Sequence, residues 1–301
     1  MLIKIGTRKS KLALWQANYL KGEIENLGLK AELVLIDSLG DIDKTSELGK
    51  LNQTGIFTKA LDNALLDKEI HLAIHSLKDY PTVPPDGITI TSTGQREDPR
   101  DVLVNNDVER DITASVFNIG TGSIRRKAQW KYKYKNTIFH NLRGNVPTRL
   151  EKLWDSDWDG IIMAHAGLNR LSMLNDQCTT LDWMIPAPSQ GVLGISYRTD
   201  DPFIAKLTAQ LQVEEVELCS QVERKFLNLL EGGCSAPIGA LAKIKGDQIV
   251  FKGSLHDPNG YEAFFVEKTV DKGECLSQVS DWVNEILVAG GDKIMLKIKA
   301  Q

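Results

Sequence analysis

The chain has 301 residues, enough for two or three domains that each bury a hydrophobic core. Hydrophobic residues make up 42% of it and charged residues 25%, as in ordinary globular proteins, and no apolar run reaches membrane-spanning length. The net charge of −4 excludes a general basic surface for nucleic acid, so any anion site must be a local cluster. The N-terminus lacks the apolar segment of a secretory signal and the four cysteines form no CxxC pair, which predicts a cytoplasmic protein with free thiols.

The N-terminal region predicts a βαβαβ unit. Strands are expected at residues 2–5, 31–36 and 72–74, and helices at 12–27 and 57–65. Ser10 stands where the first helix needs its N-terminal cap. This alternation implies a parallel sheet with helices on its faces. The polar stretch 37–54 is long for a plain connection and predicts a functional loop.

The alternation resumes after residues 94–100, GQREDPR, which predict a crossover into a second domain. Strands are expected at 116–120, 137–140, 160–164 and 191–197, and helices at 123–130 and 146–154. The prolines near 186–188 and the pair Asp201-Pro202 are interpreted as turns. After a helix-rich passage at 213–230, residues 238–244, 248–255 and 263–269 predict antiparallel strands, followed by a helix at 276–287. We therefore expect an α/β protein with a small α+β C-terminal domain.

Polar residues follow the buried strand at 72–74, in the stretch HLAIHSLKDYPTVPP. Ligands of open α/β sheets bind just past the carboxyl ends of strands, so Lys78 beside Asp79 predicts an acid/base site. The ammonium group would keep the carboxylate ionised, whereas burial would oppose ionisation. The alternative is a solvated turn with a surface ion pair.

The turn Gly120–Arg126 contains G-x-G, but Arg125 stands where a dinucleotide motif needs its last glycine. An anion site is the better interpretation, because backbone N–H groups at a helix start and two guanidinium groups lie together. The alternative is that Arg125 and Arg126 are two exposed arginines on a helix.

Further arginines occupy the same position, just past expected strand ends: Arg8, Arg143, Arg149 and Arg170. Arginine forks match carboxylate and phosphate geometry. Their repeated placement predicts a cleft that holds several carboxylates or phosphates.

Cys234 lies in the Gly-rich loop EGGCSAP. The Cys234 thiol is interpreted either as buried and inert or as the nucleophile of a Cys-His hydrolase. The sequence shows no local motif of such a hydrolase. His71 and His75 are four residues apart, a metal-binding spacing on a helix, but they flank a predicted strand, so no metal site is expected.

Together these motifs resemble the hydroxymethylbilane synthase (porphobilinogen deaminase) family. The stretches that carry the resemblance run in family order over nearly the whole chain: GTRKSKLALWQA (6–17), FTKALDNALL (57–66), HSLKDYPTVPP (75–85), REDPRD (96–101), GTGSIRRKAQ (120–129), LRGNVPTRL (142–150), AGLNRL (166–171), QGVLGI (190–195) and LEGGCSAPIG (230–239).

The resemblance implies two periplasmic-binding-protein-like domains with mostly parallel sheets and a small third domain with an antiparallel sheet. The expected boundaries are 1–95 plus 192–210 for domain 1, 96–191 for domain 2 and 211–301 for domain 3. It also implies a transferase of tetrapyrrole (heme) biosynthesis that condenses four porphobilinogen molecules head to tail, releasing ammonia each time. Each pyrrole carries an acetate and a propionate, which fits the many arginines.

The family's cofactor is a dipyrromethane held by a thioether, and the attachment residue maps to Cys234. The catalytic carboxylate maps to Asp79, which would stabilise positive charge as ammonia leaves. The implied cofactor-binding residues are Ser76, Lys78, Ser123, Arg125, Arg126 and Arg149. The implied substrate-binding residues are Arg8, Ser10, Phe57, Arg143 and Arg170. No metal, nucleic acid or membrane partner is implied, and we expect a monomer.

The chain departs from the family pattern at several positions: Leu39, Thr45 and Thr54 in and after the loop, Gly122 in the arginine turn, and Pro188-Ser189. The loop changes affect how it would close over the site. Two rival hypotheses therefore accompany the enzyme: a non-catalytic two-lobed cytosolic binding protein for an anionic small molecule, and a homologue that keeps the fold without turnover.

Overall fold

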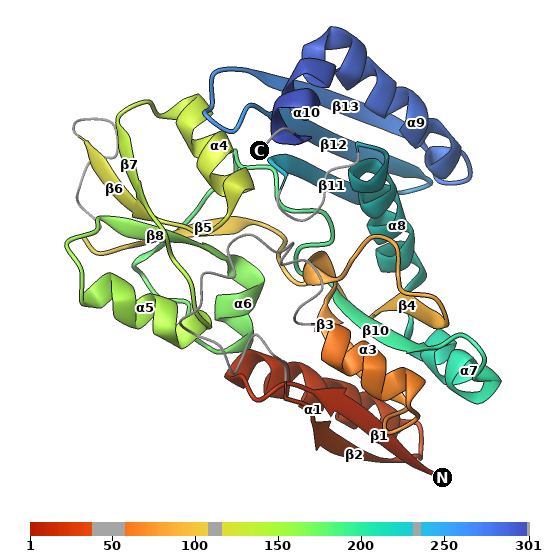
Figure 1. The fold of residues 1–301 in the computed structure, drawn as a ribbon. Helices are drawn as coiled ribbons and strands as arrows, with labels where there is room; N and C mark the ends of the chain where they lie inside the picture. The colour runs from red at the N-terminus through yellow and green to blue at the C-terminus, as the bar shows by residue number, and fades with distance from the viewer. Residues whose placement is uncertain (38–57, 108–115, 231–235, 300–301) are drawn as a thin grey trace. The chain divides into compact units, whose positions relative to one another are not determined.

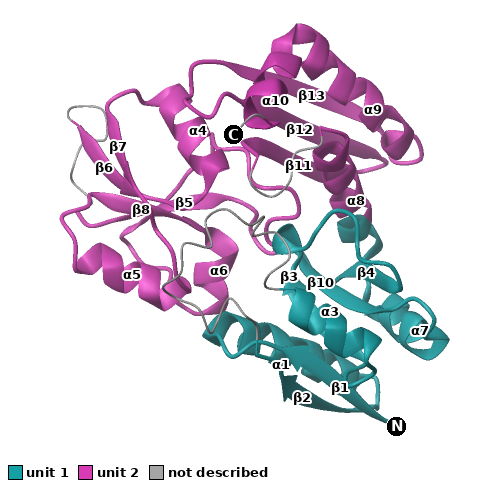
Figure 2. Cartoon of the chain, viewed as in Figure 1, with its two compact units in different colours: residues 1–96, 192–217 teal, residues 97–191, 218–301 magenta. Residues whose placement is uncertain are grey.

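The computed structural model describes residues 1–37, 58–107, 116–230 and 236–299, shown as a ribbon in Figure 1. The chain forms two compact units, coloured separately in Figure 2. Unit 1 comprises residues 1–96 and 192–217, and unit 2 comprises residues 97–191 and 218–301. The chain therefore passes between the units three times, the last time within helix α8 (Glu214–Leu229).

Unit 1 contains a five-stranded sheet in the order β2-β1-β3-β10-β4. Its strands are β1 (Leu2–Thr7), β2 (Lys30–Leu35), β3 (Leu72–Ser76), β4 (Ile88–Thr93) and β10 (Leu193–Arg198). Its helices are α1 (Lys11–Asn26), α3 (Lys59–Leu66) and α7 (Pro202–Leu211). β1, β2 and β3 run parallel, and β10 runs antiparallel to both β3 and β4. The predicted βαβαβ unit with a parallel sheet is confirmed.

The core of unit 1 follows from the two periodicities of its sequence. Ile3 and Ile5 alternate on β1 with the exposed Leu2 and Lys4, and both isoleucines are fully buried. They pack in one cluster with residues of α1 such as Leu20, one of the buried residues along the apolar stripe of that helix. The cap of α1 is also as predicted, because the Ser10 hydroxyl accepts the N–H of Ala13.

Unit 2 contains a second five-stranded sheet, in the order β7-β6-β8-β5-β9. Its strands are β5 (Asp101–Asn105), β6 (Phe117–Gly120), β7 (Thr137–His140), β8 (Gly160–Ala164) and β9 (Cys178–Thr180). The helices that accompany it are α4 (Ile124–Lys133), α5 (Val146–Trp154) and α6 (His165–Arg170). The pattern repeats that of unit 1: three parallel strands, then one antiparallel strand, then one in the original direction.

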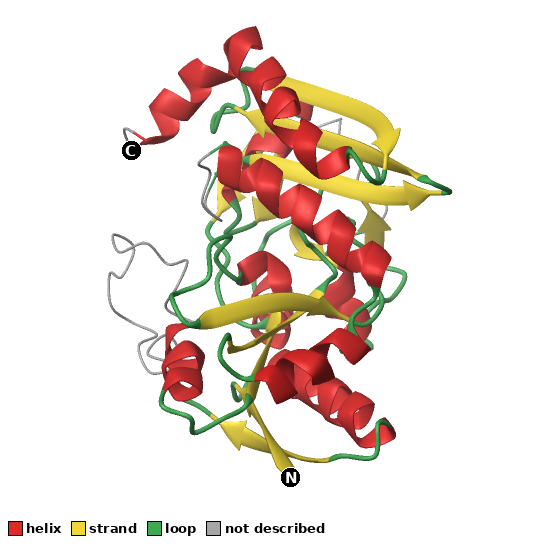
Figure 3. Ribbon diagram, turned by 90° about the vertical axis from the view of Figure 1, so that its right-hand side faces the viewer, coloured by secondary structure: helices red, strands yellow, loops and turns green. Residues whose placement is uncertain are grey.

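The C-terminal part of unit 2 is a three-stranded antiparallel sheet with helices on one face (Figure 3). Its strands are β11 (Ile238–Lys245), β12 (Gln248–His256) and β13 (Ala263–Asp271), followed by α9 (Cys275–Ile286), the π-helical turn η4 (Leu287–Gly291) and α10 (Asp292–Lys299). Phe251 of β12 packs edge-on against Phe226 of α8 and stacks on Trp282 of α9, with ring centroids 5.0 and 4.9 Å away. The predicted fold class is thus confirmed in all three sheets.

Three strands and three helices of the described chain were not predicted: β4, β5, β9, α6, α7 and α10. The interpretation of Asp201-Pro202 as a turn was wrong, because the pair begins α7. The Asp201 carboxylate accepts the N–H of Ile204 at 3.1 Å, and Pro202 fills the first helical turn. Proline is favoured there because its missing N–H would lack a helical partner anyway. None of the helices described here has the length and apolar character needed to cross a membrane.

The first strand after each of the first two crossings begins at the carboxyl edge of the parallel strands. In unit 2, Asp101 at the start of β5 pairs with Ala164 at the end of β8. In unit 1, Leu193 at the start of β10 pairs with Ser76 at the end of β3. Open α/β sheets bind ligands at this edge. The two crossing segments, at residues 96–97 and 191–192, therefore lead into strands that begin at the ligand-binding edge of each unit.

Candidate active site

In unit 1 the candidate residues gather at the carboxyl ends of β1 and β3. Arg8 follows β1, and Ser76 ends β3. Lys78 and Asp79 lie in a single 3₁₀ turn, η3 (Leu77–Asp79), that directly continues β3. Asp79 is exposed, whereas the residues on either side of the Lys78-Asp79 pair, Leu77 and Tyr80, are buried. The turn therefore presents the Asp79 carboxylate outward from a buried base.

The hydroxyl groups of this edge already accept hydrogen bonds within unit 1. Ser76 accepts one from Nε2 of the buried Gln16, at 2.8 Å. Ser10 caps α1 through its contact with Ala13 N, at 3.3 Å. Both contacts fix the hydroxyl oxygens and leave the hydroxyl protons to be donated elsewhere. Either serine can therefore donate to a ligand carboxylate without giving up the contact described here.

His75 lies one residue before Ser76 and is buried beneath the turn. Its Nε2 lies 2.8 Å from the Ser196 hydroxyl on β10. β3 continues two residues beyond the predicted strand because His75 and Ser76 pair with Gly194 and Leu193 of β10. Burial, together with a smaller contribution from the positive charge of Arg8, lowers the pKa of His75 to about 3. The imidazole is therefore neutral at physiological pH and contributes a buried hydrogen bond rather than a charge.

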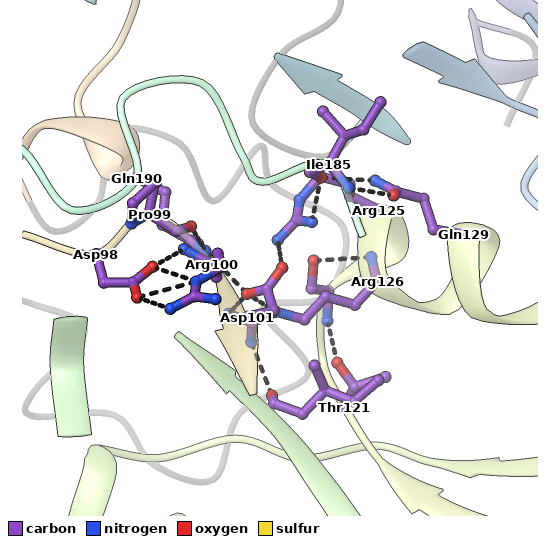
Figure 4. Close-up of polar contacts among 12 residues, drawn as sticks. Asp98, Pro99, Arg100, Asp101, Thr121, Arg125, Arg126, Gln129, Ile185 and Gln190 are labelled. Carbon is purple, nitrogen blue, oxygen red and sulfur yellow. Dashed lines mark hydrogen bonds and ion pairs between the residues drawn. The ribbon is translucent and has the colours of Figure 1, made fainter. Parts of the chain in front are cut away.

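In unit 2, Arg125 and Arg126 converge on one buried carboxylate, that of Asp101 (Figure 4). Arg126 approaches Oδ1 with Nε at 3.0 Å and Nη2 at 2.8 Å, and Arg125 reaches Oδ2 with Nη2 at 2.8 Å. Gln190 donates a further hydrogen bond to Oδ1 at 2.9 Å. Asp101 is fully buried and both arginines are 5% exposed, so the alternative of two exposed arginines on a helix is wrong.

Backbone carbonyl groups complete the arginine pair. Arg126 Nη1 donates to Ile162 O, and Arg125 Nη1 donates to Ile185 O, both at 2.8 Å. Burial lowers the pKa of Arg125, and the positive charge of Arg126 lowers it as well. The negative charge of Asp101 acts in the opposite direction and raises the pKa in part. Two guanidinium groups against one carboxylate leave a net positive charge in a dry environment, where it attracts an anion strongly. The Nε of Arg125 is buried without a hydrogen-bond acceptor in the described part of the chain.

The turn before these arginines has no room for a side chain at Gly122. A Cβ there would lie 2.6 Å from the carbonyl oxygen of Leu142. Ser123 follows as the cap of α4 and accepts the N–H of Arg126. Glycine in place of the family's serine therefore accompanies close packing of the β6–α4 turn on the segment after β7.

The other arginines of unit 2 lie in different surroundings. Arg143 is exposed, and Arg149 donates from Nε to Gly144 O at 2.7 Å. Arg170 is buried at the end of α6 and donates to Gly191 O at 2.7 Å. The Gly191 carbonyl also accepts the N–H of Glu97. Arg170 therefore stabilises the contact between Glu97 and Gly191, the residues of unit 2 at the two crossing segments.

Two candidate residues, Phe57 and Cys234, lie outside the described residues, as do Leu39, Thr45 and Thr54. Among the described residues, no group of three His, Cys, Asp or Glu side chains could hold a metal ion. His71 and His75 have separate partners: the Nδ1 of His71 accepts the N–H of Lys4 at 3.0 Å, and His75 meets Ser196.

Sequence reasoning missed the buried carboxylates. Asp101 holds the arginine pair, Asp62 accepts the Tyr80 hydroxyl, and Glu223 of α8 accepts the N–H groups of Ser189 and Ala242. The signal available for Asp101 was a lone acid opening an apolar strand, DVLV. An acid at such a place needs a cationic partner, because an unpaired buried charge is costly.

Comparison with known proteins matches the chain to a family. Residues 3–206 match the family model described as porphobilinogen deaminase, dipyromethane cofactor binding domain, and residues 217–286 match porphobilinogen deaminase, C-terminal domain. A porphobilinogen deaminase of Sulfurimonas denitrificans is 36% identical over 304 residues, covering 98% of this chain and 97% of that protein.

Solved structures also resemble part of the chain. The periplasmic VFT2 domain of Bordetella pertussis BvgS has 10% identity and a TM-score of 0.43, covering 70% of this chain and 86% of that one. A putative methionine-binding lipoprotein of Bacillus subtilis has 11% identity and a TM-score of 0.43, covering 71% of this chain and 92% of that one.

Proposed function

This chain belongs to the porphobilinogen deaminase family, and we propose that it condenses four porphobilinogen molecules head to tail, with release of ammonia, into the linear tetrapyrrole hydroxymethylbilane. The observation that carries this function is the match of both family domains, in order, over residues 3–206 and 217–286. A non-catalytic binding protein is not favoured, because the 36% identical relative spans nearly the whole chain and is an enzyme by name.

The cofactor of this family is a dipyrromethane, and the first family domain is named for binding it. When bound, it supplies the pyrrole to which substrate units are joined. The residues of unit 2 fit such a group, because the buried Nε of Arg125 has no acceptor among the described residues and the arginine pair carries excess positive charge for carboxylates. We propose that Cys234 attaches the cofactor, and that Ser76, Lys78, Ser123, Arg125, Arg126 and Arg149 bind it.

Asp79 is the proposed catalytic carboxylate. It is exposed at the carboxyl edge of the first sheet, on a turn whose flanking residues are buried. A fixed carboxylate in this position can stabilise positive charge that develops on a pyrrole as ammonia leaves, and it can accept a proton. Its placement on a short turn limits the reorganisation needed as charge develops.

The proposed substrate-binding residues are Arg8, Ser10, Phe57, Arg143 and Arg170. Arg8 and Ser10 lie at the same sheet edge as Asp79, which supports a shared site in unit 1. Arg170 is buried against the backbone of Gly191, so its contribution would be a fixed charge rather than a mobile side chain. Arg143 is exposed and can follow a growing chain of carboxylates.

We further propose three domains, at 1–95 plus 192–210, 96–191 and 211–301. The C-terminal sheet has a core of its own, built from Phe226, Phe251 and Trp282 among others, which supports a separate third domain. We also infer a monomer that acts in the cytoplasm without nucleic acid or membrane partners. Cys178, Cys219 and Cys275 form no disulfide among the described residues, which accords with a reducing compartment.

The test is turnover of porphobilinogen by the purified chain, combined with its intact mass before any denaturation. The expected result is hydroxymethylbilane, ammonia and a covalent dipyrromethane on the protein. Cys234→Ser should fold without adduct or product, while the control Cys178→Ser keeps both. A bare chain mass with no product would contradict the enzyme and favour the binding protein. An adduct without product would identify a homologue that lacks turnover.

A further inference from the structure

The turn that carries Asp79 is held from both sides by buried neighbours. Leu77 donates its N–H to Val192 O at 3.0 Å, which ties the start of the turn to the strand that returns from unit 2. Tyr80 donates its N–H to Leu77 O at 3.2 Å, which closes the turn. Both side chains pack in one cluster with Val192 and Val216. Asp79 is thus an exposed residue between two anchors.

Tyr80 is the anchor with a polar contact. Its hydroxyl donates to Oδ1 of Asp62 on α3 at 2.9 Å, and the two side chains are 1% and 4% exposed. Its ring also packs against His75, with centroids 4.8 Å apart. A phenol fixed at both its ring and its hydroxyl leaves its own backbone little freedom, and that backbone is bonded directly to Asp79.

An acidic side chain at position 62 lowers the stability of the fold, because it is buried. Its neighbours on α3, Leu61 and Leu65, are core residues, and Asp62 is buried among the same residues of that helix. Burial raises the pKa of Asp62, although the hydroxyl groups of Tyr80 and Thr58 lower it in part. A buried acid costs stability compared with an apolar residue and is best explained where it fixes a geometry.

We propose that Tyr80 and Asp62 form a positioning pair that holds the Asp79 carboxylate in its catalytic place. The inference rests on the proposed function, because it requires Asp79 to act on porphobilinogen. Neither residue of the pair is proposed to touch substrate. The pair acts through the backbone of η3, so its loss changes the aim of a carboxylate and leaves the substrate-binding arginines in place.

The first test removes single polar atoms and measures kcat and KM for porphobilinogen. Tyr80→Phe keeps the ring and deletes the hydroxyl, and kcat should fall about 10- to 100-fold, because a misplacement near 1 Å costs up to that much. KM and the mass of the covalent adduct should not change. Asp62→Asn keeps an acceptor for the hydroxyl and should keep kcat within about threefold, whereas Asp62→Leu should match Tyr80→Phe. Tyr197→Phe, on the half-buried Tyr197 of β10, is the control and should not change kcat.

The second test separates positioning from loss of stability. In the Asp79→Glu variant the carboxylate is already displaced. Adding Tyr80→Phe to that variant should lower kcat by a much smaller factor than adding it to the native chain, because the two changes act on the same geometry. The inference would be overturned if Tyr80→Phe lowers kcat by the same factor in both chains, or if Tyr80→Phe alone keeps full kcat. Either result leaves the proposed function intact as long as the native chain turns over porphobilinogen. If Tyr80→Phe does not fold, the contrast between Asp62→Asn and Asp62→Leu decides. Absence of native turnover would refute the function, and the inference with it.

Discussion

Replacing Asp101 by Asn is the sharpest test of the buried charge cluster in unit 2. The substitution keeps the size of the side chain but removes the Asp101 charge that pairs with Arg125 and Arg126, both 5% exposed. It also turns an amide NH₂ toward guanidinium N–H groups that need acceptors. Breaking a buried ion pair by removing one partner costs about 3–5 kcal/mol, because the other charge stays buried.

The assay is thermal unfolding, followed by circular dichroism at pH 7. For a folding unit of roughly 150–250 residues, each kcal/mol lowers Tm by about 2–4 °C, so Asp101→Asn should lower it by roughly 6–20 °C. The control is Asp182→Asn, since Asp182 pairs with Arg100 at 2.6 Å but is 75% exposed. An exposed pair contributes at most about 1 kcal/mol. Equal shifts in the two variants would refute the reasoning that burial makes the Asp101 cluster costly to break.

Three further predictions concern the sites. Asp79→Asn should be nearly inactive toward porphobilinogen, while Asp79→Glu, displaced by one methylene, should keep weak turnover and accumulate partly extended chains in the mass spectrum; near-normal turnover of the Asn variant would exclude the charge-based role. Arg125→Leu should yield protein with little or no covalent cofactor, whereas Arg170→Leu should keep the cofactor mass and lose turnover, and identical masses would count against separate roles. His75 stays neutral in the fold, with a pKa of about 3, but binds a proton below about 6.5 when unfolded. The native chain should therefore lose stability as pH falls, by about 2 kcal/mol from this group between pH 7.5 and 5, and His75→Gln should lose correspondingly less in urea titrations at the two pH values.

Local patterns in the sequence were enough to predict the elements with strong periodicity. The helix at 146–154 and the strands at 137–140 and 160–164 have the predicted bounds, because each combines a clear apolar pattern with turn residues at its ends. β4 and β5 were missed because they flank the crossover, where the motif GQREDPR dominates the local composition. Strand pairing there is set by β10 and β8, which lie far away in the sequence.

The polar network of the site could be predicted only in part. Arginine placement past strand ends indicated an anion site, since that edge is common to all parallel strands. The partner of the arginine pair could not be identified, because Asp101 reaches Arg126 only after β5 has paired with β8. The Tyr80–Asp62 contact likewise depends on how α3 packs beside β3, which no local pattern specifies.

The interior position of β10 in the sheet of unit 1, between β3 and β4, constrains the order in which the chain can fold during synthesis. β10 is hydrogen-bonded to β3 on one side and β4 on the other, yet it ends at Arg198. The ribosome therefore makes β5–β9 after β4 and before β10, which takes roughly 5–20 s at typical elongation rates. During that interval β3 and β4 each expose an unpaired edge, and such edges invite aggregation. The sheet of unit 2, whose strands are continuous from Asp101 to Thr180, can be completed first.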